Sequence, residues 1–496
     1  MACPYSRTFY FLIFTAMNRK IFCLLSVILA CFCLNAQDKW DLKKCVEYAV
    51  QNNISVKQAD VQARLADLEL KLRAAAKYPD LNFSGNGGYN FGRSINPATN
   101  TYQSQSIAFS NFQLQSSVVL FNWFSLKNQK EAGKLEKSAA EAGIDKARSD
   151  IAMNVAVAYL QALLANEQID IAKLQIGQTF SRLEQVRKQV KAGAVPELNA
   201  VEMEAQLATD SAAYITATAT YQQNLILLKA VINLDMAVPF DIETPDVTAI
   251  PVESLADLQP EVVYNLALAN QPLQRANQLR YQAALKNIDA AKGAMWPMLS
   301  AFGNIGSRYS SAFPDQQNLV LTPTGKNDTI GYVEISPGVI GYTVLPEFSA
   351  TAPNIPFGRQ VFDVSMSQAV GLNLSIPIFR NRQLKTGYER AKLNAETYRL
   401  QSEQDNLTLK QDIYVAYTNA VNAQQRYLAA KKGVEASEKA FEFSQKRYNA
   451  GLLSSLDLLT NQNNLNRARL DAVAAQYEFV FRMKLLEFYK GQGIKL

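Results

Sequence analysis

The sequence carries one long pattern twice, and this duplication restricts the fold more than any other feature. An alternating strand pattern ends at Phe121 in the first copy and at Phe379 in the second, and a glycine follows 72 positions later in each, at Gly193 and Gly451. The strands have the sequences LQSSVVLF and LNLSIPIF. Each 72-residue interval is free of proline, so at about 1.5 Å per residue it can form a single helix of roughly 100 Å.

The N-terminus has the pattern of a secretion signal. Arg19 and Lys20 precede the apolar run Ile21–Leu34, and small and polar residues follow, which predicts a signal over 1–36 with Met17 as a second candidate start. The segment Ile28–Cys31 allows an alternative, a lipoprotein box with Cys31 acylated. No later run reaches the roughly 18 apolar residues that a membrane-spanning helix needs, so we expect none in the mature chain.

The cysteine content and the net charge limit which disulfides and which partners the mature chain can have. Removal of the signal leaves Cys45 as the sole cysteine, which excludes an intrachain disulfide in the mature chain. Of the 50 basic residues, Arg7, Arg19 and Lys20 leave with the signal, while all 44 acidic residues stay, so the net charge falls from +6 to +3. Near neutrality gives no electrostatic reason to expect nucleic acid as a partner.

Both long helical intervals carry an apolar seam, and the first-copy interval also carries a second apolar stripe that Glu167 interrupts. Small and apolar residues recur at alternating steps of four and three from Ile151 to Val190. The same register recurs from Ile413 to Tyr448, at an offset of 258 residues. At this offset several alanines coincide, as Ala158 does with Ala416. That spacing predicts a left-handed supercoil. A second stripe from Val157 to Leu174 indicates contacts on two sides of one rod, which suits helices laid side by side in a curved wall. The alternative for such a rod alone is a bundle with no conduit.

The strands alternate in the manner of a water-filled membrane barrel. In the last strand one face carries apolar residues broken by Gln368, and the other carries small and polar ones, over residues 364–378. Phe112, Leu114, Val118 and Leu120 form the matching face in the first copy. Two further strands are expected at about 81–93 and 299–310, and aromatic residues cluster where strands meet helices. Soluble sandwich strands share this alternation.

Four strands cannot close a barrel, because the smallest membrane barrels have about eight and open edges are not tolerated in lipid. Several chains must therefore share one. Two chains would supply about eight strands and a filled interior, whereas three would supply about twelve and a passage. The predicted fold class is mainly α: a duplicated long-helix repeat, with coiled-coil packing and an α-barrel, plus four transmembrane strands per chain that a trimer completes into a 12-stranded β-barrel.

The expected domain map follows from the repeat. It comprises the signal 1–36, a first repeat 37–238, a proline-rich linker 239–260 and a second repeat 261–496. In the first repeat we expect a helix from about Trp40 to Lys77, a hairpin 81–121, a long helix 124–192, a turn, and a helix 197–234. In the second we expect a helix, a hairpin 299–379 with a long external loop 312–362 marked by prolines, a long helix 381–450, a turn, and a helix 454–490.

Taken together, signal, duplicated hairpin and paired rods resemble the TolC-type outer membrane efflux protein family over nearly all of the mature chain. The stretch Arg447–Thr460, RYNAGLLSSLDLLT, is similar to the family's periplasmic turn, and KQVKAGAVPELNAVE at 188–202 echoes it. The resemblance implies a homotrimeric exit duct in the outer membrane that reaches through the periplasm of a Gram-negative bacterium. Its implied partners are the lipid bilayer, a periplasmic adaptor (membrane fusion) protein and an inner-membrane pump in a tripartite efflux or type I secretion system.

The resemblance also implies which residues act at the periplasmic tips. Asp457 matches a carboxylate that rings the constriction, and Tyr448 matches a tyrosine of the closing network, while Asn199, Leu453 and Thr460 stand where the family would have an aspartate, an arginine and a second carboxylate. The latch is thus incomplete. Asp457 has an equally weighted alternative role as a helix N-cap after the turn. The expected adaptor-docking residues are Gly193, Ala194, Gly451, Leu452, Lys188 and Arg447.

Enzymatic function is the alternative from another class. The chain has no histidine, and it contains no nucleophile elbow, phosphate loop or metal-ligand cluster, so we expect no catalytic, cofactor or metal site. A non-channel coiled-coil structural or adhesion protein of the envelope is the stronger rival, because it explains the rods, though not why each rod follows a lipid-pattern hairpin. The identity of the cargo has no signature in the sequence.

Overall fold

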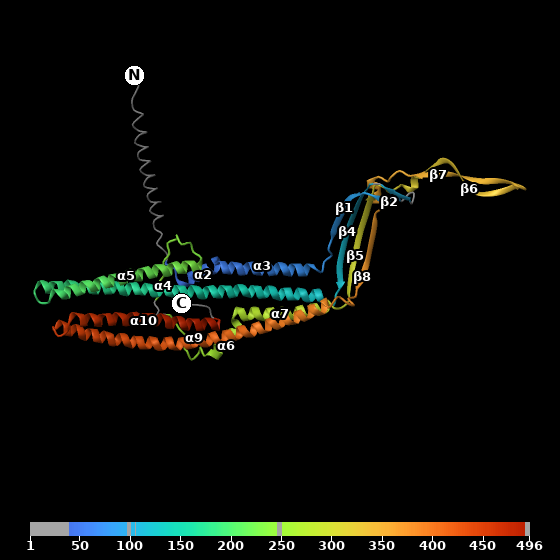
Figure 1. The fold of residues 1–496 in the computed structure, drawn as a ribbon. Helices are drawn as coiled ribbons and strands as arrows, with labels where there is room; N and C mark the ends of the chain where they lie inside the picture. The colour runs from blue at the N-terminus through green and yellow to red at the C-terminus, as the bar shows by residue number, and fades with distance from the viewer. Residues whose placement is uncertain (1–38, 97–100, 105, 246–249, 492–496) are drawn as a thin grey trace, which may run out of the picture. The chain divides into compact units, whose positions relative to one another are not determined.

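A computed structural model describes residues 39–96, 101–104, 106–245 and 250–491 (Figure 1). The expected signal, Met17 and Cys31 lie outside these residues. The chain forms two compact units: a helical one made of the described parts of 1–66, 136–280 and 398–496, and a second one made of 67–135 and 281–397 that contains the strands. Within the described part of the chain, no helix combines the length and apolar content needed to cross a bilayer.

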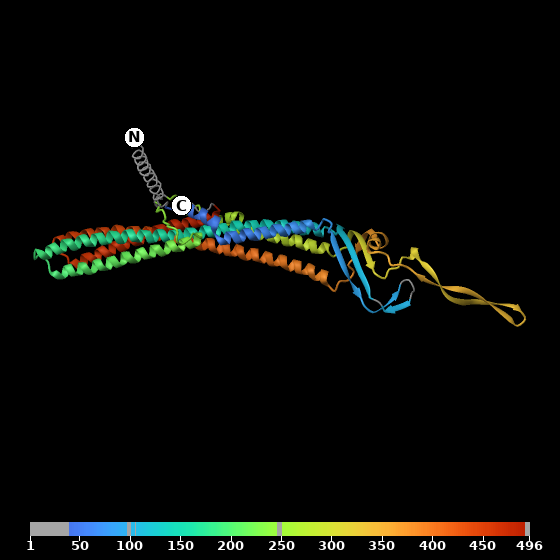
Figure 2. The ribbon, with the colours of Figure 1, turned by 90° about the horizontal axis from the view of Figure 1, so that it is seen from above.

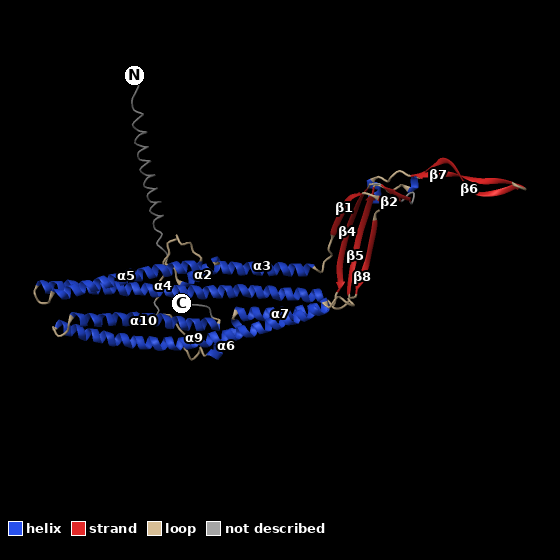
Figure 3. Ribbon diagram, viewed as in Figure 1, coloured by secondary structure: helices blue, strands red, loops and turns tan. Residues whose placement is uncertain are grey.

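The helices confirm the duplication, because every one in the first copy has a partner of equal length in the second (Figure 3). The pairs have 11, 22, 67 and 36 residues: α2 (Leu42–Asn52) with α6 (Pro260–Asn270), α3 (Ile54–Ala75) with α7 (Pro272–Gly293), α4 (Ser125–Lys191) with α9 (Gln383–Asn449), and α5 (Glu197–Ile232) with α10 (Ser455–Lys490). Between α5 and α6, the described residues form turns and extended chain, with one bridge from Ile242 to Trp40.

The single helix expected from Trp40 to Lys77 is wrong, because the chain breaks it at Asn53. The Asn53 carboxamide accepts from the Ser55 N–H at 2.8 Å and donates to the Val231 carbonyl at 3.0 Å. In the second copy Gln271 lies at the same break, before Pro272, and its amide donates to the Phe488 and Tyr489 carbonyls. The residue at each break therefore links the start of α3 to the end of α5, or the start of α7 to the end of α10. A long-range hydrogen bond of this kind has no local sequence signal.

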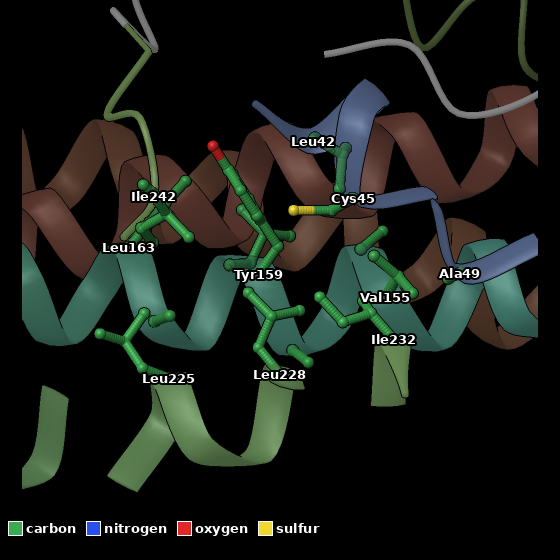
Figure 4. Close-up of a cluster of buried hydrophobic side chains, with 14 of the residues drawn as sticks. Leu42, Cys45, Ala49, Val155, Tyr159, Leu163, Leu225, Leu228, Ile232 and Ile242 are labelled. Atoms are coloured by element: carbon green, nitrogen blue, oxygen red, sulfur yellow. The ribbon is translucent and has the colours of Figure 1, made fainter. Parts of the chain in front are cut away.

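The main core of the helical unit lies where α2 packs on α4 and α5 (Figure 4). Leu42, Cys45 and Ala49 of α2 meet Val155, Tyr159 and Leu163 of α4, and Leu225, Leu228 and Ile232 of α5 close the cluster. The Tyr159 hydroxyl donates to the Glu243 carbonyl at 2.6 Å and lies 3.2 Å from the Trp40 carbonyl. Tyr159 of α4 thus contacts both the N-terminal segment and the linker.

The predicted seams are buried along much of both long helices. Val155, Ala162 and Leu183 of α4, and Ile413 and Ala420 of α9, are at most 1% exposed. Nearer the turns the second-copy seam is only half-buried, as at Tyr427 and Tyr448. Side-by-side packing of α4 with α5 and of α9 with α10 is visible in Figures 1 and 2.

The strand unit contains a four-stranded antiparallel sheet in the order β1 (Asn82–Asn90), β4 (Ile107–Phe121), β5 (Met298–Ser310) and β8 (Ser367–Ser375). A short hairpin of β2 (Arg93–Asn96) and β3 (Thr101–Ser104) joins β1 to β4. The strand expected over 364–378 is shorter than the pattern, since Val364 closes a π-helical turn, η3 (Gln360–Val364), and Ile376 and Ile378 follow the strand.

The stretch 312–362 is not the irregular loop that its prolines indicate. It contains a two-stranded hairpin, β6 (Val320–Ser336) with β7 (Val339–Thr351), preceded by η2 (Gln316–Asn318) and followed by α8 (Phe357–Arg359). Pro323 and Pro346 are compatible with it because both strands are edges, where a missing N–H can face outward. The register shifts between Pro323 and Asn327 and at two later places, which absorbs the irregular sequence.

Candidate channel elements

The first candidate element is the four-stranded sheet, which separates apolar and polar side chains as expected. Strand pairing puts Phe83, Leu114 and Ile305 in one row across the sheet, and Val118, Ala301 and Leu372 in another on the same face. The opposite face carries amides and hydroxyls, namely those of Ser84, Gln113, Asn304, Ser367 and Asn373. Phe302 is an exception, and its ring fills the space above Gly371, where a Cβ would lie 2.9 Å away.

Much of the apolar face of this sheet is left uncovered by the residues that the structure describes. Val370 is 90% exposed, Phe83 70% and Leu372 67%. A soluble sheet would bury such a face against a second layer, so the sandwich alternative does not fit. The outer edges of β1 and β8 pair with no other segment that the structure describes. A sheet with an uncovered apolar face and two open edges is incomplete in a single chain.

The second candidate element is the pair of turns that end the long helices, and their backbones are alike. Gly193 has φ +71° and Gly451 φ +74°. At the first turn Gly193 donates to the Val190 carbonyl and Ala194 to the Gln189 carbonyl, both at 2.9 Å. At the second, Gly451 donates to Tyr448 and Leu452 to Arg447, also at 2.9 Å. This is the Schellman arrangement, in which a glycine in the left-handed region ends the helix.

The helices that return from these turns begin differently. Helix α5 starts after Pro196, which has no side chain to cap it. Helix α10 starts after Ser454, whose hydroxyl accepts from the Asp457 N–H at 3.1 Å and donates to the Asp457 carboxylate at 2.7 Å. The N-cap is therefore Ser454, and the alternative role of Asp457 as the N-cap is wrong. The sequence signal was present, because serine three residues before an acidic residue is the capping-box pattern.

The candidate gate residues lie at or beside the turns. Tyr448 is half-buried near the end of α9, and the exposed Asp457 and Thr460 lie at the start of α10. Asn199 occupies the position in α5 that Asp457 occupies in α10, and its N–H donates to the Pro196 carbonyl. No hydrogen bond or ion pair among the described residues joins Asn199 to Asp457.

Arg182 is a further candidate residue that no sequence pattern indicates. Arg182 of α4 lies with its guanidinium carbon 5.8 Å from the Phe441 ring of α9, and its Nη1 atom is buried without a hydrogen-bond partner in the described part of the chain. Burial lowers the pKa of Arg182, and interaction with Tyr448 opposes this change. An arginine of the first repeat thus interacts electrostatically with a tyrosine of the second repeat. Because the two are far apart in the chain, no local pattern links them.

The two copies also pack together close to the turns. Leu183 and Val186 of α4 share a buried cluster with Met203 of α5 and Leu459 of α10. Nearby, the Gln462 amide donates to Gln178 at 3.1 Å. The predicted docking residues lie outside this cluster and are all exposed: Lys188, Gly193, Ala194, Arg447, Gly451 and Leu452. Among the described residues no cluster of three or more potential metal ligands occurs.

These elements define a class of envelope protein in which an incomplete sheet with a bare apolar face is connected to paired long helices. The sequence model of the family described as outer membrane efflux protein matches residues 46–234 and 263–482, and the chain belongs to this family. Membership places it in the outer membrane of a Gram-negative bacterium and in a family of efflux proteins rather than enzymes.

Individual relatives are distant but extend over most of the chain. The cation efflux system protein CusC of Escherichia coli K12 is 24% identical over 437 residues, which are 88% of this chain and 83% of that protein. The toxin and drug export protein A of Aggregatibacter actinomycetemcomitans is 20% identical over 88% of this chain and 83% of its own. A crystal structure of CusC matches with a TM-score of 0.72 at 17% identity, over 91% and 92% of the two chains. The Campylobacter jejuni CmeC channel matches with a TM-score of 0.68 at 18% identity, over 92% and 86%.

Proposed function

We propose that this chain forms a homotrimeric exit duct that carries small molecules across the periplasm and the outer membrane, as part of a tripartite efflux or type I secretion system. The observation that supports this most directly is the four-stranded sheet, whose apolar face is bare and whose edge strands β1 and β8 are both open. Neighbouring copies can pair β8 with β1, so that no edge faces lipid. Three copies then give a sheet of about twelve strands, wide enough for a water-filled passage.

The polar face of the sheet would line that passage. It carries the amides of Gln113, Asn304 and Asn373, which can contact water, while Leu372 and Val370 of the opposite face contact lipid. The long helices would form the rest of the duct, since the sequence of α4 indicates contacts on two sides and such helices can lie side by side in a closed wall. This protein would act as a passive conduit and not as an enzyme.

The turns are the proposed gate. Three copies of Asp457 would form a ring whose negative charge concentrates cations at the entrance. Asp457 is also the capping-box partner of Ser454, and its exposed carboxylate can fill both roles. The proposed closing contact joins Tyr448 of the second repeat to Arg182 of the first repeat. It would replace the arginine that the family pattern would have at Leu453.

Conductance in planar bilayers tests the duct against the rival function, an envelope rod or adhesion protein. We expect the purified full-length chain to give discrete single-channel currents, with cations preferred over anions. Asp457→Asn should lower that preference, and Asn199→Asp, at the equivalent position of the first copy, should raise it. A chain that inserts into the bilayer and passes no current would exclude the duct and leave the rod.

The proposed partners are a periplasmic adaptor (membrane fusion) protein and its inner-membrane pump, and docking would use the exposed residues of the two turns. Photo-crosslinkers at Ala194 and Leu452 should capture the adaptor, because both residues follow directly on the glycine caps. Charge reversal by Lys188→Glu should lower export, whereas Lys57→Glu, an exposed lysine on α3, serves as the matched control. Equal export by both variants would argue against docking at the turns.

A further inference from the structure

A cavity of about 460 Å³ lies in the helical unit at the break between α6 and α7, and the duct described so far gives it no role. Its walls are formed by residues of α4 within 146–154, of the break and the start of α7 over 271–274, of α9 within 405–412, and of the end of α10 at Phe488 and Tyr489. All of these residues belong to the helical unit. The volume is that of a small-molecule site, which is typically about 300–1,000 Å³.

Polar wall residues of this cavity have apolar equivalents in the first repeat. Gln274 occupies the position in α7 that Val56 occupies in α3, and Asp405 of α9 corresponds to Ala147 of α4. Val56 is buried in the main core, and Ala147 packs against that core. The second repeat therefore has an amide and a carboxylate at positions that the first repeat uses for apolar packing. Polar groups at such positions need partners of their own.

Gln274 is the wall residue whose partner is missing from the protein. It is 7% exposed, and its carboxamide forms no hydrogen bond with any residue that the structure describes. A buried amide without a partner lowers the stability of a fold, and the great majority of such groups in proteins are paired. Because no protein group pairs with this amide, a molecule in the cavity is the available partner.

Two carboxylates give the cavity a negative charge that no protein cation balances. Asp405 accepts from the amide of the buried Asn277 at 2.6 Å, and Asp412 lies about two turns further along α9. Neither carboxylate forms an ion pair with a lysine or arginine in the described part of the chain. The other two charged residues of the wall, Lys146 and Asp150, pair with each other. A concave wall with this charge attracts cations.

The rest of the wall is largely apolar and includes Met153, Leu409, Phe488 and Tyr489. Burial raises the pKa of Tyr489, and the Asp412 carboxylate raises it further, so ring and carboxylate are near enough to interact. Such a lining does not suit a hydrated metal ion, which prefers several oxygen ligands, and the described residues contain no group of three potential metal ligands. It suits a cation with an apolar body, which aromatic rings also attract.

We propose that this cavity binds an organic cation with an aromatic or aliphatic body. The charge of the molecule faces Asp405 and Asp412, its body packs against Leu409 and Phe488, and Gln274 forms a hydrogen bond with one of its polar groups. Because every wall residue belongs to one chain, the site does not depend on the trimer of the proposed function.

Ethidium, a planar aromatic cation, is the probe for this site. Fluorescence anisotropy of ethidium with the full-length protein in detergent, corrected for protein-free micelles, gives the affinity. We expect saturable binding, and Asp412→Asn should weaken it by about fivefold or more, because one of the two attracting carboxylates is lost. Glu435→Gln removes the same charge from an exposed position of α9 outside the cavity and should leave the affinity unchanged. Equal affinities of the two variants would overturn the site.

Gln274→Leu provides a second measurement on the same protein. It should weaken ethidium binding by about threefold or more, since an amino group of the dye loses its hydrogen bond. The unfolding temperature should stay the same or rise, because a buried amide without a protein partner is removed. Unchanged binding together with a lower unfolding temperature would identify a purely structural amide and overturn the contact.

Binding and conductance together separate this site from the duct. Currents in planar bilayers without saturable ethidium binding would overturn the site and leave the duct intact. Binding that depends on Asp412, in a chain that passes no current, would support the site and overturn the duct. The anionic dye anilinonaphthalene sulfonate should bind more weakly than ethidium. If it bound as tightly, and equally well to Asp412→Asn, the preference for a cation would be overturned.

Discussion

The two copies of the repeat have the same backbone at the end of each long helix and different chemistry at the start of the next. Gly193 and Gly451 adopt φ values within a few degrees of each other and close the same pair of hydrogen bonds. The returning helices then begin at Pro196 without a side-chain cap and at Ser454 with a side-chain cap from its hydroxyl. Duplication has kept the geometry that reverses the chain, whereas Asp457, the carboxylate of the proposed gate, has the uncharged Asn199 at the equivalent position of the first repeat.

The strands likewise comprise a frame that both repeats share, which is the four-stranded sheet, and additions that differ between the repeats. β1 with β4 and β5 with β8 contribute equally to one sheet, with a common apolar face. Their outer connections differ, because the first contains the short β2–β3 hairpin and the second contains the 320–351 hairpin. Substitutions at equivalent positions should therefore have equal effects in the frame and unequal effects in the additions.

The largest effect is expected on the apolar face of the sheet. Leu114→Arg and Leu372→Arg place a charge toward lipid in the first and second copy, and each should destabilise the inserted protein by about 2–4 kcal/mol near the membrane midplane. Gln113→Arg and Asn373→Arg, on the polar face of the same strands, are the matched controls. Folding into lipid vesicles at increasing urea concentrations, followed by gel shift, measures the difference. Equal tolerance on both faces would contradict the assignment of the faces.

Next in size is the cost of a side chain at the two turns. Gly193→Ala and Gly451→Ala should each destabilise the protein by about 1–2 kcal/mol, because the left-handed backbone is unfavourable for a residue with a Cβ even in open space. Gly177→Ala and Gly433→Ala, inside α4 and α9, should instead stabilise by about 0.5–1 kcal/mol. Denaturant unfolding in detergent, followed by circular dichroism, checks both signs. A large difference between the two turns would show that the copies are less alike than their backbones.

An unequal effect is expected at the starts of α5 and α10, which follow the two turns. Ser454→Ala should cost about 1 kcal/mol, since the hydroxyl that accepts from the Asp457 N–H is lost. Pro196→Ala removes no cap from α5 and should change little at that helix start. Hydrogen exchange in the first turn of each helix measures the local effect. Faster exchange in both variants to the same extent would mean that the caps do not distinguish the copies.

The sequence predicted the frame well because the frame depends on periodicity. A seam such as Ile151 to Val190 and an alternation such as that around Leu372 are read from neighbouring residues, and the structure buries the first and exposes the second. What the sequence did not predict depends on distant partners. Asn53 lies at a helix break and bonds to Val231, Arg182 lies near the Phe441 ring of the second repeat, and the prolines of 312–362 are accommodated in a hairpin because both of its strands are edges.

The smallest effect concerns Cys45, whose equivalent in the second copy is Val263, also fully buried. Burial raises the pKa of the Cys45 thiol from 9.0 to about 12, so the thiol stays neutral at pH 8 and iodoacetamide should modify it only when the chain unfolds. Any stability that this shift contributes is present below pH 9 and is lost as the pH rises toward 12. In the double variant Cys45→Ala with Val263→Cys, the new thiol should be equally protected from alkylation. In Cys45→Ala with Leu452→Cys, the thiol at the exposed turn should react at once. Mass spectrometry of the alkylated protein gives the rates, and rapid native reaction at position 45 or 263 alone would show that the two helices α2 and α6 are not packed alike.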